Sequence, residues 1–377
     1  MQTITLTPTL TPPSITLTDE QQTAINSILA WFNGHTPMNH VPRHEFKLGG
    51  YAGTGKTTII NYLLTEITSI RANVCAFTGK ACHVLRKKGI HSSQTIHSMI
   101  YDCEENKDGS VSFVLKRRLE GNPNLIVIDE ASMLSSDLYR DLLTFNIPLL
   151  FIGDPGQLEP VGDNPNLMLA PNYVLTKIHR QALNSPIITL ATQVRQGFPV
   201  KITDPTGACL VKAKFITDEE LSQCSQVICA KNATRSILNR RIRTALGRVD
   251  APLNLGEKLI CLRNNRRYAM FNGLICYVED FTEHEHYWLC TLRDEGDKIY
   301  HSIRVWKKPF LTPLEKLEQP PRDMLYFDYG YAITCHKSQG SEWPHVLVYD
   351  EIMFKTDMKR WRYTAITRAS EKLTYCI

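Results

Sequence analysis

The sequence predicts an α/β protein of more than one domain, with parallel sheets and β-rich insertions. Short apolar runs alternate with helical stretches, which is typical of a parallel sheet with crossover helices. Closely spaced segments of alternating apolar residues in the second half are typical of a small barrel. The length of 377 residues exceeds the size at which single hydrophobic cores stop growing.

The chain is expected to begin with a loose arm followed by a helix. Residues 1–16 are rich in Thr and Pro and lack the basic start and apolar core of a signal peptide. The segment LTDEQQTAINSILAWF has an N-cap candidate at Thr18 and apolar residues at helical spacing. No run approaches the length of about 18 apolar residues that a membrane span needs, so we expect no membrane contact.

Charge and cysteine content set broad limits on the class of protein. The net charge of +5 permits a polyanionic partner without demanding one. The 11 cysteines are scattered, without a C-x-x-C pair and without a short secreted scaffold to staple. We therefore expect reduced thiols and a cytoplasmic location.

Four apolar runs are the buried-strand candidates of the first half, namely EFKLGG, ANVCAFTG, NLIVIDEAS and PLLFIGD. Between the second and the third, the segment 101–120 has a Lys-Asp-Gly turn followed by alternating apolar residues, which predicts a β-hairpin. From 256 to 324, alternating segments surround turns at Asn272-Gly273 and Glu295-Gly296. This second pattern predicts a small inserted β-barrel.

A phosphate-binding loop follows the first strand candidate. GGYAGTGKTT has the G-x-x-x-x-G-K-[ST] spacing and precedes a helical run, which is the context that this motif requires. Lys56 is expected to reach the β and γ phosphates, and the Thr57 hydroxyl is expected to bind Mg²⁺. The predicted nucleotide contacts in this loop are Gly50, Gly53, Thr54, Gly55, Lys56, Thr57 and Thr58.

Polar side chains follow two further strand candidates. LIVIDEAS contains Asp129 and Glu130, of which one carboxylate suits Mg²⁺ and the other the polarisation of an attacking water. FIGDPGQLEPV presents Gln157, an amide that cannot act as a strong acid or base. Because ligands of open α/β sheets bind at the carboxyl ends of strands, we expect Gln157 to face the γ-phosphate. Ordinary turn residues, solvated or bonded to backbone, are the alternatives.

Nine segments in order resemble the motifs of superfamily 1 helicases: LTDEQQTAI, GYAGTGKTT, FTGKACHVL, SQTIHSMI, IVIDEASML, GDPGQLEPV, LTKIHRQ, YAITCHKSQGSEW and YTAITRAS. The resemblance is to superfamily 1B, in the branch that contains bacterial RecD and the phage helicase Dda, and it covers residues 17–375. It suggests a compact phage or bacterial member of that branch.

The resemblance implies two RecA-like domains with parallel sheets and ATP in the cleft between them. The implied parts are a first RecA-like domain at 17–100 and 121–174, a strand-separating pin hairpin at 101–120, a second RecA-like domain at 175–255 and 325–377, and an SH3-like barrel at 256–324. ATP and Mg²⁺ are the implied cofactors.

The resemblance also carries nucleotide-site roles onto matching residues. Gln21 is implied to select adenine, and Gln157 to couple the state of the γ-phosphate to the nucleic-acid groove. Gly340 and Glu342 are implied to lie near the phosphate or the ribose.

Arg180 and Arg368 are implied to be arginine fingers from the second domain. A guanidinium from the far domain stabilises transition-state charge only when the cleft is closed, which would tie hydrolysis to domain motion. Surface charges are the alternative for both arginines.

The implied track for nucleic acid consists of Thr78, Lys80, Thr95, His97, His336, Lys337 and Ser338. Hydroxyls, amides and lysines at loop ends suit phosphate contacts, which position a strand without reading its sequence. For the histidines, a buried hydrogen-bonded imidazole is the more frequent alternative. In the pin, Phe113 is a candidate to stack on the last base pair, and an ordinary core aromatic is weighed equally.

The sequence thus predicts an ATP-dependent DNA helicase that translocates on single-stranded DNA and unwinds duplexes in replication, recombination or repair. The 5′ to 3′ direction is implied only by the resemblance. Expected partners are single-stranded DNA and its junctions with duplex, with a single-strand-binding protein or replisome components as candidates, and a monomer is expected. The alternatives are a translocase that displaces proteins with little unwinding, an RNA helicase, and a P-loop kinase or GTPase.

Overall fold

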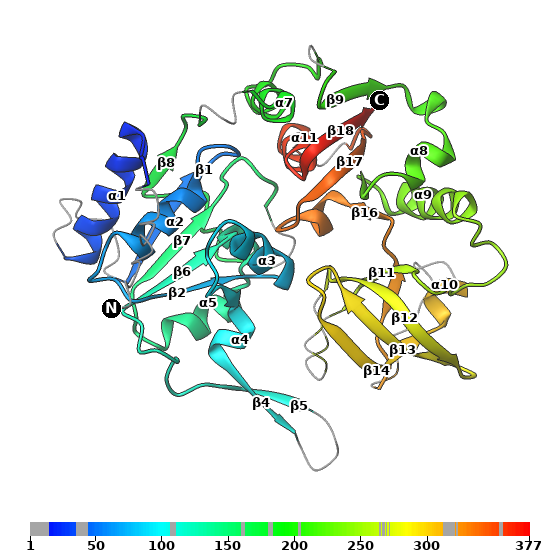
Figure 1. The fold of residues 1–377 in the computed structure, drawn as a ribbon, viewed down its shortest axis with the longest axis horizontal. Coiled ribbons are helices and arrows are strands. Elements are labelled where there is room, and N and C mark those ends of the chain that lie inside the picture. The colour runs from blue at the N-terminus through cyan, green and yellow to red at the C-terminus, as the bar shows by residue number, and fades with distance from the viewer. Residues whose placement is uncertain are drawn as a thin grey trace, which may run out of the picture.

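The computed structural model describes residues 15–34, 44–105, 111–159, 163–179, 184–202, 205–263, 265, 268, 270, 272–311, 321, 323–353 and 357–377. Two α/β bodies lie side by side, with a β-barrel below the second and a hairpin below the first (Figure 1). Nearly all of the predicted arm at 1–16, the hairpin turn at 107–109 and Arg180 lie outside the described residues.

The first body is built on a parallel sheet with the order β3-β2-β6-β7-β1-β8. Its strands are β1 (Glu45–Gly50), β2 (Ala72–Ala76), β3 (Gln94–Thr95), β6 (Leu125–Asp129), β7 (Leu149–Gly153) and β8 (Tyr173–Leu175). Its helices are α1 (Asp19–Phe32), α2 (Lys56–Thr65), α3 (Gly79–Lys87), α4 (Ile96–Ile100), η1 (Ala131–Met133) and α5 (Ser136–Leu143). All four strand candidates of the first half therefore form strands of this sheet.

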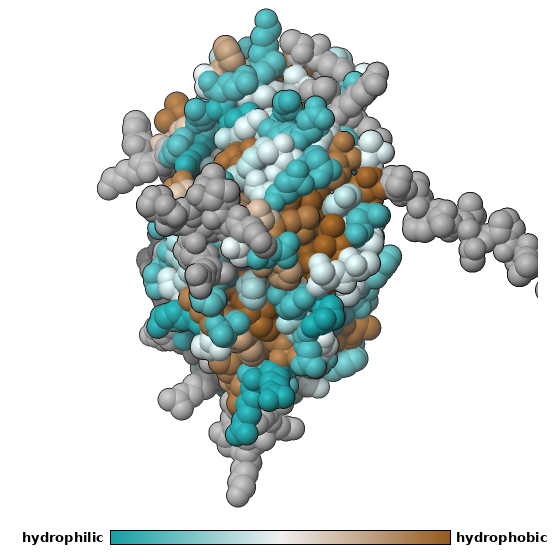
Figure 2. All heavy atoms as spheres, turned by 90° about the vertical axis from the view of Figure 1, so that its left-hand side faces the viewer, coloured by the Kyte–Doolittle hydropathy of each residue, from teal (hydrophilic) through white to brown (hydrophobic). Residues whose placement is uncertain are grey.

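Both faces of this sheet are buried, as a parallel sheet with crossover helices requires. Along β7, Leu150 and Ile152 pack into the hydrophobic cluster that contains α1, whereas Leu149 and Phe151 pack into a second cluster with α5. The predicted helix start is confirmed, because Thr18 caps α1 in a reciprocal capping box. Figure 2 views the molecule from the left-hand side of Figure 1, and hydrophobic residues show there among hydrophilic ones.

The second body has its own parallel sheet, with the order β16-β10-β17-β18-β9. Its elements are α7 (Pro186–Arg195), β9 (Ala208–Val211), η2 (Ala213–Phe215), α8 (Asp218–Ser222), β10 (Gln226–Cys229), α9 (Asn232–Ala245), β16 (Ala332–Thr334), η4 (Cys335–Ser338), β17 (Trp343–Tyr349), α11 (Met358–Ile366) and β18 (Ala369–Cys376). Alternate residues of β17 again enter different clusters, with Val346 and Val348 on one side and Leu347 on the other. Among the described ranges, no helix has the length and apolar character of a bilayer crossing.

The predicted barrel is an antiparallel sheet with the order β14-β13-β12-β11-β15. Its elements are β11 (Lys258–Cys261), β12 (Ile275–Glu283), β13 (Tyr287–Asp294), β14 (Ile299–Trp306), α10 (Lys308–Leu311) and β15 (Phe327–Tyr329). A bridge between Val305 and Leu325 brings β14 to the segment just before β15, so the two edges of the sheet meet. The barrel thus continues past the predicted boundary at 324, and its assignment as SH3-like stays a prediction.

The predicted hairpin consists of β4 (Tyr101–Glu105) and β5 (Val111–Leu115), paired antiparallel with Tyr101 opposite Leu115. It projects from the lower end of the first body (Figure 1). Phe113 lies within β5 and not in the turn, and its ring contacts Tyr101 at 5.7 Å and His97 at 6.2 Å between centroids. A strand-separating role for this hairpin stays a prediction.

A buried carboxylate joins the barrel to α9 of the second body. Glu257 is 0% exposed and precedes β11. It accepts hydrogen bonds from Arg243 Nε at 3.1 Å and from the Tyr331 hydroxyl at 2.9 Å. Because each partner comes from a different segment, Glu257 fixes how the barrel is attached.

Replacing this carboxylate is expected to destabilise the protein. Glu257→Ala leaves the Arg243 guanidinium, only 12% exposed, without this counter-charge, and we expect the free energy of unfolding to fall by about 3 kcal/mol. Urea unfolding followed by circular dichroism measures the change. The control is Glu279→Ala, which removes an exposed ion pair with Arg293 in the same barrel and should cost less than about 1 kcal/mol. Equal losses for the two variants would contradict the prediction.

Candidate functional site

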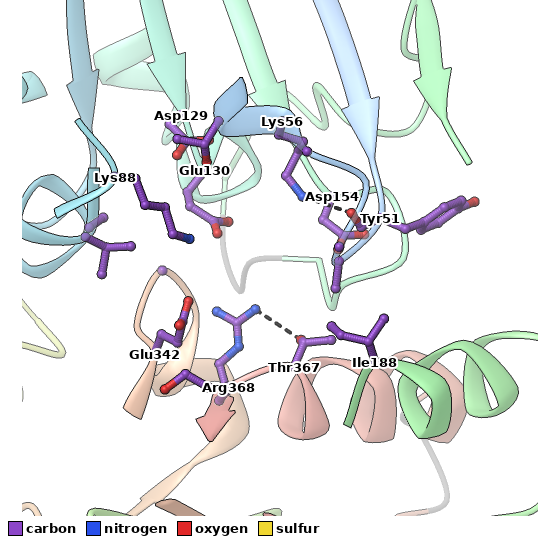
Figure 3. Close-up of a pocket in the computed structure, with 18 of the residues that line it drawn as sticks. Tyr51, Lys56, Lys88, Asp129, Glu130, Asp154, Ile188, Glu342, Thr367 and Arg368 are labelled. Carbon is purple, nitrogen blue, oxygen red and sulfur yellow. Dashed lines mark hydrogen bonds between the residues drawn. The ribbon is translucent and has the colours of Figure 1, made fainter. Parts of the chain in front are cut away.

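A cavity of about 490 Å³ lies between the two α/β bodies. In Figure 3, Lys56, Asp129 and Glu130 face it from the first body, and Glu342 and Arg368 face it from the second. The predicted site residues that line it are Gly53, Gly55, Lys56, Thr57, Thr58, Asp129, Glu130, Gln157, Gly340, Glu342 and Arg368. The structure therefore brings together residues separated by most of the chain.

The phosphate-loop segment connects β1 to the start of α2. Gly55 has a φ of 80° and caps α2, and a Cβ atom there would lie 2.2 Å from Gln21 Nε2, so only glycine fits. Lys56 begins the helix, and its Nζ donates to the Gly50 carbonyl at 2.7 Å. The first turn of α2 thus points at the cavity, where unpaired N–H groups and the helix dipole favour an anion.

Gln21 lies behind this loop and does not line the cavity. Its side chain is 1% exposed, Oε1 accepts from Thr18 N at 3.0 Å, and Nε2 donates to the Thr54 carbonyl at 3.2 Å. Both ends of the amide are therefore engaged within the protein and support the loop from α1. The selection of adenine by Gln21 stays a prediction.

Asp129 and Glu130 lie at the carboxyl end of β6. Burial raises the pKa of Asp129 to about 6, with a further contribution from the charge of Glu130 and an opposing one from Lys56. Glu130 has a left-handed backbone, with φ 52°. Among the described residues, its Oε2 is buried and makes no hydrogen bond. An unpaired buried carboxylate oxygen costs free energy, so this atom suits a bound water or metal-bound ligand.

The Gln157 loop is bonded to the second body. Gln157 is 5% exposed and lines the cavity, and its Oε1 makes no hydrogen bond to any described residue. The next residue, Leu158, donates its N–H to Thr364 Oγ1 at 2.8 Å and accepts at its carbonyl from Gln339 Nε2 at 2.5 Å. The loop that carries Gln157 is therefore held at its main chain by Thr364 of α11 and by Gln339, which directly follows η4.

A second bond across the bodies joins Asp154 to Tyr363. The Tyr363 hydroxyl donates to Asp154 Oδ2 at 2.6 Å and accepts from Ala52 N at 2.8 Å. Burial raises the pKa of Asp154 above its ordinary value, and the hydrogen bond from Tyr363 opposes this rise without cancelling it. Tyr363 lies in the YTAITRAS motif but was not predicted as a site residue, because an aromatic residue in a helix is usually a core residue.

Arg368 is the arginine that the structure places in the cavity. It is 5% exposed, and its guanidinium donates to the carbonyls of Thr364 and Ser341, both at 3.1 Å. It points toward the first body (Figure 3). Arg180, the other predicted finger, lies outside the described residues, but its neighbour His179 lines the cavity with a buried Nε2 that bonds no described residue.

The charged and polar groups that line the cavity suit a nucleotide bound together with Mg²⁺. It combines a helix start, the Lys56 ammonium and Arg368 with the carboxylates of Asp129 and Glu130. Unpaired buried atoms of Glu130, Gln157 and His179 surround it among the described residues. Thr57 and Asp129 are the residues suited to hold Mg²⁺, which prefers oxygen ligands and retains several waters.

Several of the predicted nucleic-acid contacts are engaged by other groups of the protein. Thr78 and Thr95 cap α3 and α4 after β2 and β3, and His97 packs against Phe77 and Phe113.

The remaining predicted contacts come from α3 and η4. Lys80 Nζ is paired with Glu295 at 2.8 Å, and Lys337 Nζ donates to Asn272 Oδ1 at 2.8 Å. Ser338 is 0% exposed and donates to the Cys335 carbonyl. Burial lowers the pKa of the half-buried His336.

Comparisons with known proteins agree with this geometry. Residues 16–206 match the family described as AAA domain, and residues 329–375 match the UvrD-like helicase C-terminal domain. The ATP-dependent RecD2 DNA helicase of Deinococcus radiodurans is 26% identical over 355 residues, which are 86% of this chain and 46% of that protein. The ATP-dependent DNA helicase dda of Enterobacteria phage T4 is 28% identical over 197 residues, 48% of this chain and 43% of that protein.

The chain thus spans less than half the length of these two relatives. Among solved structures, the fold is similar to that of a Pif1 helicase from Bacteroides in complex with ADP-AlF3 and single-stranded DNA. The TM-score is 0.52 at 18% identity, over 96% of this chain and 92% of that one. This likeness supports the fold of two α/β bodies.

The buried charge of Asp129 leads to a prediction about stability and pH. Its pKa of about 6 lies above the value of about 3.9 in an unfolded chain, so the folded state binds the proton more tightly and loses stability as pH rises from about 4 to 6. In the ligand-free protein, we expect Asp129→Asn to raise the free energy of unfolding by about 2 kcal/mol near pH 8 and to give no gain near pH 4.

Urea unfolding at the two pH values tests this expectation. The control is Asp137→Asn, which changes an exposed carboxylate paired with Arg140 on α5. We expect it to shift the free energy by less than about 0.5 kcal/mol. A native-like stability of Asp129→Asn near pH 8 would show that the ionised carboxylate carries no burial cost.

Proposed function

We propose that this chain couples ATP hydrolysis to movement along single-stranded DNA. The chain belongs to the AAA domain family and is a superfamily 1B helicase of the RecD, Dda and Pif1 type. One observation carries the proposal: Arg368 of the second body faces Lys56 and Glu130 of the first across one cavity. A site divided between two bodies makes hydrolysis depend on their relative position, which is what a motor requires.

Each site residue has a role in the proposed hydrolysis. The loop amides and Lys56 hold the β and γ phosphates, while Thr57 and Asp129 hold Mg²⁺. The bound metal supplies neutralisation of phosphate charge. Glu130 orients the attacking water and polarises its O–H bond, and Arg368 stabilises the charge that develops on the γ-phosphate. Arg180 is proposed as a second finger on the basis of the resemblance.

Coupling is proposed to run through the loop after β7. Gln157 is proposed to donate a hydrogen bond from its side-chain amide to the γ-phosphate. The next residue, Leu158, is already bonded to Thr364 and Gln339 of the second body. Loss of the phosphate would release Gln157, and the adjacent main-chain bonds would pass that displacement to η4 and α11. A change at the nucleotide is thereby converted into a movement between bodies.

The proposed track is single-stranded DNA, with Thr78, Lys80, Thr95, His97, His336, Lys337 and Ser338 as candidate contacts at the helix starts and at η4. Such contacts suit phosphates and predict little base specificity. The hairpin β4–β5 is proposed as the wedge that separates strands. Because Phe113 packs at the His97 side of the hairpin, a supporting role for this ring is favoured over direct stacking on DNA.

The class of enzyme is tested by ATPase rates without polymer, with single-stranded DNA and with RNA. We expect DNA to stimulate the native chain, and Lys56→Ala to lower the stimulated rate about 100-fold or more because the β and γ phosphates lose the ammonium that holds them. Lys87→Ala, an exposed lysine of α3, is the matched control and should remain active. Turnover that ignores every nucleic acid would overturn the proposal, and stimulation by RNA alone would select an RNA helicase.

Direction and unwinding are tested with duplexes that carry a 5′ or a 3′ tail. We expect unwinding only from the 5′ tail, since a motor that moves 5′ to 3′ on a tail meets the duplex only there. Replacing residues 104–112 by a short turn should reduce unwinding per ATP while ATP hydrolysis persists. Unwinding confined to 3′ tails would reject the direction, and unwinding that does not change with the short turn would reject the wedge.

A further inference from the structure

Three side chains from three parts of the molecule meet beside the cavity. Lys80 of α3 pairs with Glu295 at 2.8 Å, and its Nζ lies 3.8 Å from the centroid of the Trp343 ring. The indole Nε1 of Trp343 donates to the other carboxylate oxygen of Glu295 at 2.7 Å. The carboxylate of the barrel turn therefore joins the first body to β17 of the second.

This cluster borders the proposed nucleotide site. The main-chain N–H of Trp343 donates to the Arg368 carbonyl at 2.9 Å. Glu342, the residue before Trp343, lines the cavity together with Arg368. The side chains of Lys80 and Glu295 are only 15% and 14% exposed, so their attraction is screened less than that of a surface pair. A shift of the barrel turn is thus transmitted directly to residues of the cleft.

A second turn of the barrel contacts another lysine in a similar way. Lys337, another candidate phosphate contact, donates to Asn272 in the turn that precedes β12, at 2.8 Å. Both candidate lysines are therefore engaged by turns of the same barrel. A phosphate of the polymer that binds either ammonium would therefore share it with a barrel oxygen or replace that oxygen.

We propose that Glu295 restrains DNA binding: its carboxylate occupies the Lys80 ammonium, where a DNA phosphate would bind, and docks the barrel on the cleft until the polymer displaces it. The inference rests on the proposed function, because it assigns Lys80 to the phosphate track. The exchange conserves charge. The Lys80 ammonium exchanges the Glu295 carboxylate for a DNA phosphate, and the freed carboxylate becomes solvated together with its turn.

The test uses Glu295→Gln, which keeps an oxygen that accepts from the Trp343 indole but removes the charge opposite Lys80. We expect the concentration of oligo-dT that half-saturates the ATPase to fall about fivefold, because no internal ion pair has to be broken. The dependence of log affinity on log salt should become steeper by up to about 0.7, the value for one phosphate on a single strand. Glu295→Asp, which retains the charge, should stay within about twofold of the native chain.

Two further variants separate this role from a merely structural one. Glu279→Gln removes a barrel carboxylate that pairs with Arg293 of the same sheet and is remote in sequence from Lys80, and it should leave oligo-dT affinity and the salt slope unchanged. In a Lys80→Ala background, Glu295→Gln should give no further tightening, since the effect acts through Lys80.

Each outcome decides the matter. Weaker or unchanged DNA affinity in Glu295→Gln, or equal tightening in the Lys80→Ala background, overturns the inference while leaving the proposed function intact if the native chain is stimulated by DNA. A native chain without such stimulation removes the proposed function, and this inference with it.

Discussion

The bonds at Leu158 are the constraint on which the rest of the site depends. The N–H and carbonyl of this one residue are both bonded to the second body, so the loop that carries Gln157 belongs mechanically to both halves of the molecule. The bond from Tyr363 to Asp154 adds a buried attachment at the other end of the same loop. Buried hydrogen bonds are short-ranged and directional, so they fix relative position more tightly than hydrophobic contact does.

The cleft also concentrates charge at a cost in stability. Asp129 and Glu130 lie together at the end of a buried strand, with a pKa of about 6 for Asp129. Such an arrangement is unfavourable in the free protein and becomes favourable when cations and phosphate occupy the cavity. Atoms of Glu130, Gln157 and His179 that bond no described residue belong to the same pattern, because their partners are expected to come with the ligand.

Local chemistry explains what the sequence could predict. The cap at Thr18, the glycine at 55 and the acidic end of β6 depend on residues close in the chain, and parallel strands place their carboxyl ends at one edge. Partners far apart in the chain were not predictable. Nothing near Lys80 indicates that its counter-charge is Glu295, and nothing near Gln21 shows that its amide supports Thr54. The closure of the barrel by Leu325 was missed because a single bridge has no periodic pattern.

The attachment of the barrel has a mechanical consequence. The chain enters through β11 and leaves through β15, and these two strands are neighbours in the sheet. Only Gly330 and Tyr331 separate β15 from β16, which leads directly into η4. The barrel is therefore connected to the second body through two adjacent strands. A rotation of the barrel would act directly on the segment that carries Lys337.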